Sequence, residues 1–163
     1  GDVNGDGVTD LVVGAYVDDD GGTNTGAVYV LFRSSGSTTT IASHFKVSDT
    51  AGGFTGVLDN GDNFGVSVAT GDVNGDGLVD LVVGAFGDDD GGTDKGAVYV
   101  LFRGFTGVLD NGDNFGVSVA TGDVNGDGLV DLVVGAYYDD DGTNNKGAVY
   151  VLYRGSVSAT TIA

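Results

Sequence analysis

The chain of 163 residues has no cysteine, methionine, proline or tryptophan, and it also lacks glutamate and glutamine. Without cysteine it can form neither a disulfide nor a thiolate metal site. With His44 as its single histidine, it lacks the usual nucleophile–base pairs of hydrolases, which predicts a non-enzymatic protein and a structural His44. No apolar run is long enough to cross a membrane and no secretory signal is visible, so we expect no membrane insertion.

Positive charge is scarce as well. Six lysines and arginines stand against 24 acidic residues, all aspartate, which gives a formal net charge of −18. This balance argues against nucleic acids and anionic membrane surfaces as partners. The excess of negative charge also destabilises a compact state through self-repulsion unless cations bind. Three bound Ca²⁺ ions would add +6 and change the net charge from −18 to −12.

Glycine, valine, threonine, tyrosine and phenylalanine are plentiful, and strong helix formers are few. This composition favours strands and turns, and no segment keeps an apolar period of 3.6 residues. Short apolar runs such as Leu81–Ala85 and Gly96–Phe102, with the alternating Phe64–Ala69 and the short Phe105–Leu109, are separated by Gly-, Asn- and Asp-rich turns. The sequence therefore predicts an all-β fold with about four short antiparallel strands per repeat.

Internal repeats organise the chain. Residues 53–103 and 104–154 are almost identical at a period of 51, whereas the first repeat carries a Ser/Thr-rich insertion at 34–52. Residues 122–163 also realign with residues 1–42 at an offset of 121. We divide the chain into repeat 1 (1–53, lacking its first strand), repeat 2 (54–104) and repeat 3 (105–163, with the start of a second insertion).

The central strands are apolar on both faces, so they need cover on both sides. Repeats stacked face to face provide that cover, as in propeller blades and solenoids. No polar capping face is visible at either terminal repeat, so we expect both to expose apolar surface unless something continues the stack.

A ten-residue loop, Gly-Asp-Val-Asn-Gly-Asp-Gly-x-x-Asp, occurs at residues 1–10, 71–80 and 122–131, each time directly before Leu-Val-Val-Gly-Ala. Counted from Asp2, side-chain oxygens stand at positions 1, 3, 5 and 9, glycine at position 6 permits a sharp turn, and position 7 offers its carbonyl. Three carboxylates and an amide suit Ca²⁺ better than Zn²⁺ or Cu²⁺. An Asx-rich turn without metal is the alternative. Position 12 is valine instead of the bidentate glutamate of an EF-hand, and a strand-like run follows where a dockerin-type loop would begin a helix.

These motifs resemble the FG-GAP repeat, the blade of integrin α-subunit β-propellers and of bacterial extracellular proteins. The residues that carry the resemblance are Phe64-Gly65, the loop at 71–80 with the run that follows it, and Gly96–Val100. The resemblance implies tandem four-stranded antiparallel blades, under three in this chain, in an open stack or partial propeller, since closed propellers use 4–8 blades. It implies one Ca²⁺ per loop, three in all, between the first two strands of each blade. The implied ligands are Asp2, Asn4, Asp6, the Val8 carbonyl and Asp10; Asp72, Asn74, Asp76, the Leu78 carbonyl and Asp80; and Asp123, Asn125, Asp127, the Leu129 carbonyl and Asp131.

The chain departs from the family where Gly-Ala-Pro is replaced by Gly-Ala-aromatic, and we expect Tyr16, Phe86 and Tyr137 to pack between repeats.

The aspartate triplets at 18–20, 88–90 and 139–141 favour solvated loops, with a second cation site as the alternative. Segments 59–63 and 110–114 suit turns. We expect Arg33, Arg103 and Arg154 to pair with nearby carboxylates. The Ser/Thr stretches 34–40 and 156–161 suit either O-glycosylated segments or plain loop and edge strand.

Two non-enzymatic functions fit these features. The first is a calcium-stabilised extracellular structural repeat protein that associates with itself head to tail into a fibre or longer array, because a contact that does not close generates a filament. The alternative is a fragment of an integrin-like adhesion propeller, on the cell surface, whose loops bind a protein or glycan ligand. A third reading is an accessory propeller of a secreted enzyme.

Overall fold

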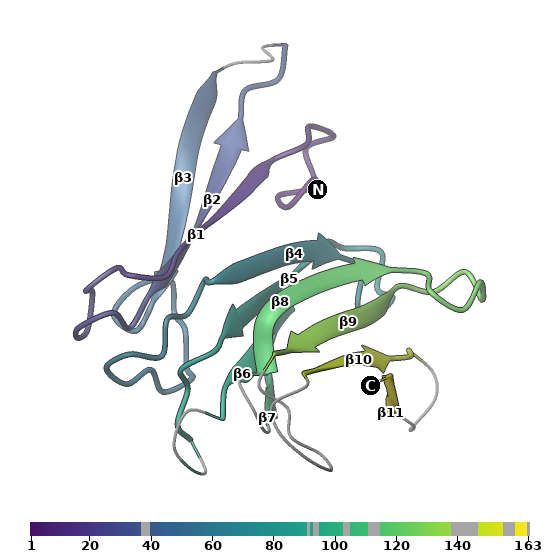
Figure 1. Ribbon diagram of the computed structural model, residues 1–163. Coiled ribbons are helices and arrows are strands. Elements are labelled where there is room, and N and C mark those ends of the chain that lie inside the picture. The colour runs from purple at the N-terminus through teal and green to yellow at the C-terminus, as the bar shows by residue number, and fades with distance from the viewer. Residues whose placement is uncertain are drawn as a thin grey trace.

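The computed structural model describes residues 1–36, 40–90, 92, 95–102, 105–110, 115–137, 147–154 and 159–162. Within these ranges the secondary structure is entirely β, in three antiparallel sheets (Figure 1). No helix in the described part of the chain could span a membrane. The all-β prediction is confirmed. The triplet at 139–141, Arg103, residues 111–114, and residues 37–39 and 156–158 of the two Ser/Thr stretches lie outside the described residues.

Each sheet takes most of its strands from one repeat, but the strand Phe105–Asp110, at the start of repeat 3, joins the sheet of repeat 2. We refer to residues 1–48, 54–110 and 115–162 as unit 1, unit 2 and unit 3. The sheet of unit 1 has three strands in the order β1-β2-β3, and the other two have four, β4-β5-β6-β7 and β11-β10-β9-β8. The strands are β1 (Leu11–Ala15), β2 (Ala27–Arg33), β3 (Ile41–Ser48), β4 (Ser67–Gly71), β5 (Asp80–Ala85), β6 (Ala97–Phe102), β7 (Phe105–Asp110), β8 (Phe115–Gly122), β9 (Asp131–Ala136), β10 (Ala148–Leu152) and β11 (Ala159–Ile162).

The central hairpin has the same register in all three units. Leu11 pairs with Leu31, Leu81 with Leu101 and Leu132 with Leu152. Because side chains alternate between the two faces of a strand, this common register gives every unit the same two apolar faces.

Two segments differ from the sequence-based prediction. The insertion of repeat 1 contains strand β3, which pairs along β2 where unit 2 has β7 along β6. The predicted strand at Phe64–Ala69 begins only at Ser67, because Phe64 instead bridges to Gly26 of unit 1. Three backbone N–H groups of this segment donate to carbonyls of unit 1: Gly61 to Thr23 (2.9 Å), Asn63 to Asn24 (3.0 Å) and Phe64 to Thr25 (3.0 Å).

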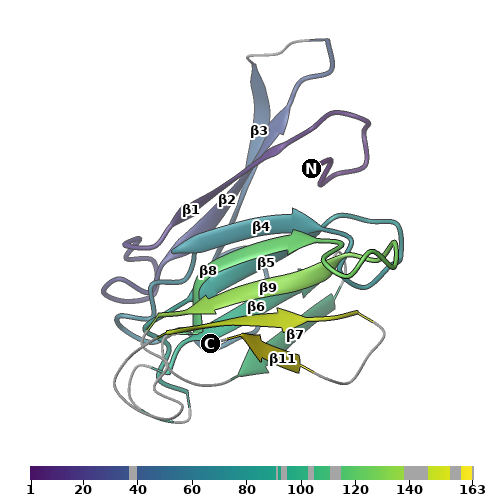
Figure 2. The ribbon, with the colours of Figure 1, turned by 45° about the vertical axis from the view of Figure 1, so that its right-hand side comes forward.

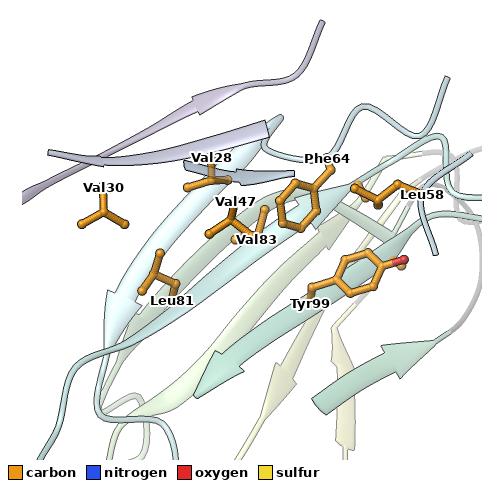
Figure 3. Packing of buried hydrophobic residues seen from close by; sticks show 10 residues of the cluster. Val28, Val30, Val47, Leu58, Phe64, Leu81, Val83 and Tyr99 are labelled. Atoms are coloured by element: carbon orange, nitrogen blue, oxygen red, sulfur yellow. The ribbon is translucent and has the colours of Figure 1, made fainter. Parts of the chain in front are cut away.

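The units pack face to face and bury an apolar layer at each junction. Between units 1 and 2 the layer includes Val28, Val30, Leu81, Val83 and Tyr99 (Figure 3). Between units 2 and 3 it is formed by Val82, Val98, Val100, Leu132, Val134 and Ala136. Strand β5 therefore contributes to both layers with alternate residues, as expected for a strand that is apolar on both faces.

Aromatic packing supports the first junction, but not with the residues expected. Phe54, Phe64 and Tyr99 form a cluster with ring centroids 5.1–5.5 Å apart. Tyr16 and Tyr137 each expose nearly half of their surface, so the expectation that they pack between units is wrong at these two positions. Phe64 is fully buried because it lies on the bridge between the units.

Glycines let the backbones of neighbouring units approach closely. A Cβ atom at Gly14 would lie 1.9 Å from the carbonyl oxygen of Gly65, and one at Gly84 would lie 1.8 Å from that of Gly116. At Gly135 in unit 3 the nearest atom to such a Cβ is Ser118 Oγ, at 2.3 Å, which is a side chain of the same unit. The first two glycines are therefore required by the junctions.

We predict that Gly84→Ala lowers the free energy of unfolding by about 2–3 kcal/mol, because the methyl group forces units 2 and 3 apart. Gly135→Ala is the matched control in the equivalent strand position, and rotation of Ser118 leaves it within about 1 kcal/mol of wild type. Urea unfolding followed by circular dichroism measures both. Equal losses in the two variants would contradict the assignment of Gly84 to the junction.

Candidate functional site: the three aspartate loops

The three repeated loops lie side by side at one end of the stacked sheets (Figure 2). Residues 72–79 join β4 to β5, residues 123–130 join β8 to β9, and residues 1–10 lead into β1. A Cβ atom at Gly1 would touch Val79 of the next loop, and one at Gly71 would touch Val130. The architecture thus gathers three acidic loops into one row.

Each loop is held by hydrogen bonds from its own backbone to its acidic side chains. In the first loop, Asp2 accepts from the N–H groups of Gly5 (2.8 Å), Asp6 (3.0 Å) and Gly7 (2.8 Å). Asn4 Oδ1 accepts from Asp6 N (2.9 Å), and Asp6 Oδ1 accepts from Val8 N (2.8 Å). The side chains at positions 1, 3 and 5 therefore all turn inward, towards the loop backbone.

The other two loops repeat this pattern. Asp123 accepts from Gly126, Asp127 and Gly128, and Asp72 accepts from Gly75 and Gly77. The glycine at position 6 has a φ of +84°, +84° and +83° in the three loops, a conformation that residues with a Cβ rarely adopt. The loop shape is thus encoded locally, with aspartate carboxylates as acceptors and glycine at the turn.

The aspartate at position 9 ties the loop to the sheet. Asp10 accepts from Val3 N (3.0 Å) and from Arg33 N (3.1 Å) at the end of β2. Asp131 makes the same two bonds, to Val124 N (3.0 Å) and Arg154 N (3.0 Å). Asp10, Asp80 and Asp131 are buried, unlike the aspartates at positions 1 and 5 of the loops. Position 9 therefore has a structural role that does not depend on a metal.

All fifteen predicted ligands lie in these loops, five to each. Their donors are oxygen atoms only, the chemistry that Ca²⁺ and Mg²⁺ prefer. Within the described ranges, no three carboxylate or imidazole side chains form a ready-made metal cluster. A carboxylate oxygen that accepts one hydrogen bond keeps a second lone pair for a ligand, so the donor set fits a hard cation.

The arginines behave differently from the prediction. Arg33 donates through Nη1 to the carbonyl of Thr9 (3.1 Å), and the ion pairs among the described residues are those of Lys46. The guanidinium of Arg154 lies against Gly75, in the loop of the preceding unit, where it would overlap a Cβ atom. Nothing local in the sequence indicates this contact, because it depends on the stacking of units 2 and 3.

The first aspartate triplet is only partly solvated. Lys46 Nζ on β3 donates to both oxygens of Asp18 (2.8 and 3.0 Å) and to Asp20. The hydrogen bond from Lys46 holds the pKa of Asp18 below its usual value. Burial alone would lower the pKa of Lys46, but the bonds to Asp18 and Asp20 outweigh it and raise that pKa. The ammonium also lies 5.3 Å from the ring centroid of Tyr29.

The second triplet departs further from a solvated loop. Asp88 is 1% exposed and accepts a hydrogen bond from the hydroxyl of Tyr99. Asp62, in the turn predicted at 59–63, is 3% exposed, and burial raises its pKa to about 6. Burial likewise raises the pKa of Tyr99. The solvated-loop prediction is therefore wrong for Asp88, because the turn at 59–63 folds over it.

Comparison with known proteins agrees with the repeat and the loop. The family model described as FG-GAP repeat matches residues 1–31, 64–101 and 115–152. Integrin alpha-PS2 of Drosophila melanogaster is 42% identical over 111 residues, 57% of this chain and 8% of its own length. Integrin alpha pat-2 of Caenorhabditis elegans is 32% identical over 94% of this chain and 13% of its own length. Phosphatidylinositol-glycan-specific phospholipase D of Bos taurus is 34% identical over 95% of this chain and 20% of its own length. The chain thus spans a fifth or less of each of these relatives.

We predict that Asp131→Ala destabilises the protein in chelator-containing buffer by about 2–4 kcal/mol, because the partly buried N–H groups of Val124 and Arg154 lose a charged acceptor. The matched variant Asp127→Ala removes an exposed carboxylate of the same loop and costs about 1 kcal/mol or less. Thermal unfolding without metal measures both changes. Equal effects would show that position 9 has no separate structural role.

Proposed function

Because the chain belongs to the FG-GAP repeat family, we propose that it is a calcium-stabilised extracellular structural segment whose units associate head to tail with further units. Those units stand in a second copy of the chain or elsewhere in the same polypeptide. The role is non-catalytic. The observation that carries this proposal is the exposure of the two outer faces of the stack.

The outer face of unit 1 has the same residues as faces that are covered in the other units. Leu11 is 50% exposed, whereas its counterparts Leu81 and Leu132 are 8% and 3% exposed. Val13 is 45% exposed, whereas Val83 and Val134 are fully buried. This face therefore matches in chemistry the faces that units 2 and 3 present to the unit before them.

The outer face of unit 3 matches in chemistry the faces that units 1 and 2 present to the unit after them. Val149 is 43% exposed, whereas its counterparts Val28 and Val98 are fully buried under the next unit. A stack has two different ends, so joining one end to the other repeats the internal junction. Such a heterologous contact extends indefinitely when its rotation does not close into a ring.

The negative charge of the three loops favours bound calcium. Each loop carries three aspartates, and the stacking brings the three loops into one row, within a chain of net charge −18. A hard divalent cation on each set of implied ligands would reduce this repulsion and fix the loop.

Two other functions have support. The identity with the two integrin α subunits favours a segment of an adhesion propeller that binds a protein or glycan at a cell surface. The match to the phospholipase D favours an accessory module of a larger enzyme. Both lead to a closed ring of about 4–8 blades in the parent protein, whereas the structural proposal leads to an open array.

We expect calcium to stabilise the folded chain. At tenfold excess over the dissociation constant, each site that binds only the folded state adds about 1.4 kcal/mol. The melting temperature should therefore rise with Ca²⁺ and fall again with chelator, and the triple variant Asp72→Asn, Asp123→Asn, Asp2→Asn should lose most of this response. A melting temperature insensitive to Ca²⁺ and chelator would overturn the calcium assignment.

We expect the chain to form concentration-dependent assemblies in Ca²⁺, measured by analytical ultracentrifugation and electron microscopy. Leu11→Asp and Val149→Asp should each abolish assembly, because each places a charge in the junction. Val17→Asp, at a similarly exposed valine outside both faces, is the control and should assemble as wild type does. A monodisperse monomer at every concentration would refute self-association, and closed rings would favour the adhesion propeller.

A further inference from the structure

A cluster of buried acidic side chains lies in unit 2, away from the three loops. Asp62 and Asp88 are 3% and 1% exposed. Asp62 Oδ2 accepts from Asp59 N (2.7 Å), but the buried Oδ1 has no hydrogen-bond partner. A buried carboxylate oxygen without a donor is costly, and a cation is one of the few partners that offsets this cost.

The cluster is assembled from three segments. Gly87 N donates to the Asp62 carbonyl (3.1 Å), which holds the turn at 59–63 against the loop of Asp88. The Tyr99 hydroxyl on β6 donates to Asp88 and lies 3.3 Å from the Val57 carbonyl oxygen. Figure 3 shows this hydroxyl directed towards the segment that carries Leu58. The charge of Asp88 acts on Asp62 and that of Asp62 acts on Tyr99, so the two carboxylates and the phenol lie near one another.

Unit 1 shows a cation at the equivalent position. Asp18 and Tyr29 are the counterparts of Asp88 and Tyr99, and Lys46 Nζ lies against both of them. Lys46 pairs with Tyr29 across β2 and β3, whereas the residue that pairs with Tyr99 across β6 and β7 is Val108. Unit 2 therefore keeps the aspartate and the tyrosine, as Asp88 and Tyr99, and adds Asp62. It has Val108 at the position in the register where unit 1 has Lys46.

We propose that Asp62 and Asp88, with the Tyr99 hydroxyl and the Val57 carbonyl nearby, form a further binding site for a hard divalent cation such as Ca²⁺. Its donors are all oxygen, and two carboxylates with Asp59 and Asp89 close by favour a divalent over a monovalent ion. The ion takes the role that Lys46 has in unit 1. The turn at 59–63 also donates to Thr23 of unit 1, so the ion stabilises the junction between units 1 and 2.

The test is calorimetric titration of the full chain with Ca²⁺. Asp62→Asn keeps the shape of the side chain and should bind one Ca²⁺ fewer than wild type. Asp49→Asn removes one exposed charge in a turn outside the cluster and should bind as wild type does. Because the readout is the difference between wild type and variant, it holds whether or not the three loops bind calcium. An unchanged stoichiometry and affinity in folded Asp62→Asn would overturn the proposal.

A second variant tests the same site by replacement. Val108→Lys places an ammonium in the register of Lys46 and should also lose one Ca²⁺ while raising the melting temperature in chelator. Terbium luminescence excited through tyrosine should fall in Tyr99→Phe and in Val108→Lys. If Val108→Lys retains the full calcium stoichiometry and the terbium signal, no cation binds at Asp62 and Asp88.

Discussion

The close approach of backbones between neighbouring units is the constraint on which the rest of this structure depends. At Gly14 and Gly84 the next unit comes so near that a single Cβ atom would overlap a carbonyl oxygen. This approach brings the apolar faces of successive sheets into contact and covers β5 on both sides. It also explains why the central strands need no polar face, because a strand inside the stack has no solvent-exposed face.

The same stacking concentrates negative charge, and the chain handles that charge in different ways at different places. Backbone N–H groups stabilise the carboxylates of the three loops locally. Lys46 on β3 forms ion pairs with Asp18 and Asp20 of the first aspartate triplet. In unit 2 the equivalent carboxylate is buried against a tyrosine hydroxyl beside a second buried aspartate. Units 1 and 2 thus differ in their electrostatics, because the insertion supplies β3 and its lysine to unit 1.

Much of the fold follows from the sequence, because its signals are local. The apolar runs predict β5, β6 and their counterparts, and the loop pattern predicts which side chains gather at the turn. What the sequence did not predict depends on contacts between units. Phe64 leaves the expected strand to bridge to Gly26, Arg154 reaches the loop of the preceding unit, and Asp62, in the turn expected at 59–63, is buried. The strand within the insertion was also missed, because its Ser/Thr-rich beginning hides the apolar residues that follow.

Hydrogen exchange of the backbone amides at the junction of units 1 and 2 tests the stacked arrangement most directly. The N–H groups of Gly61, Asn63 and Phe64 lie in turns, yet each donates to a carbonyl of unit 1. If the units stack as described, these three amides should exchange as slowly as those of β5 and β6, because exposing them requires separation of the units. Exchange as fast as that of an unstructured peptide would show that the units do not hold together in solution.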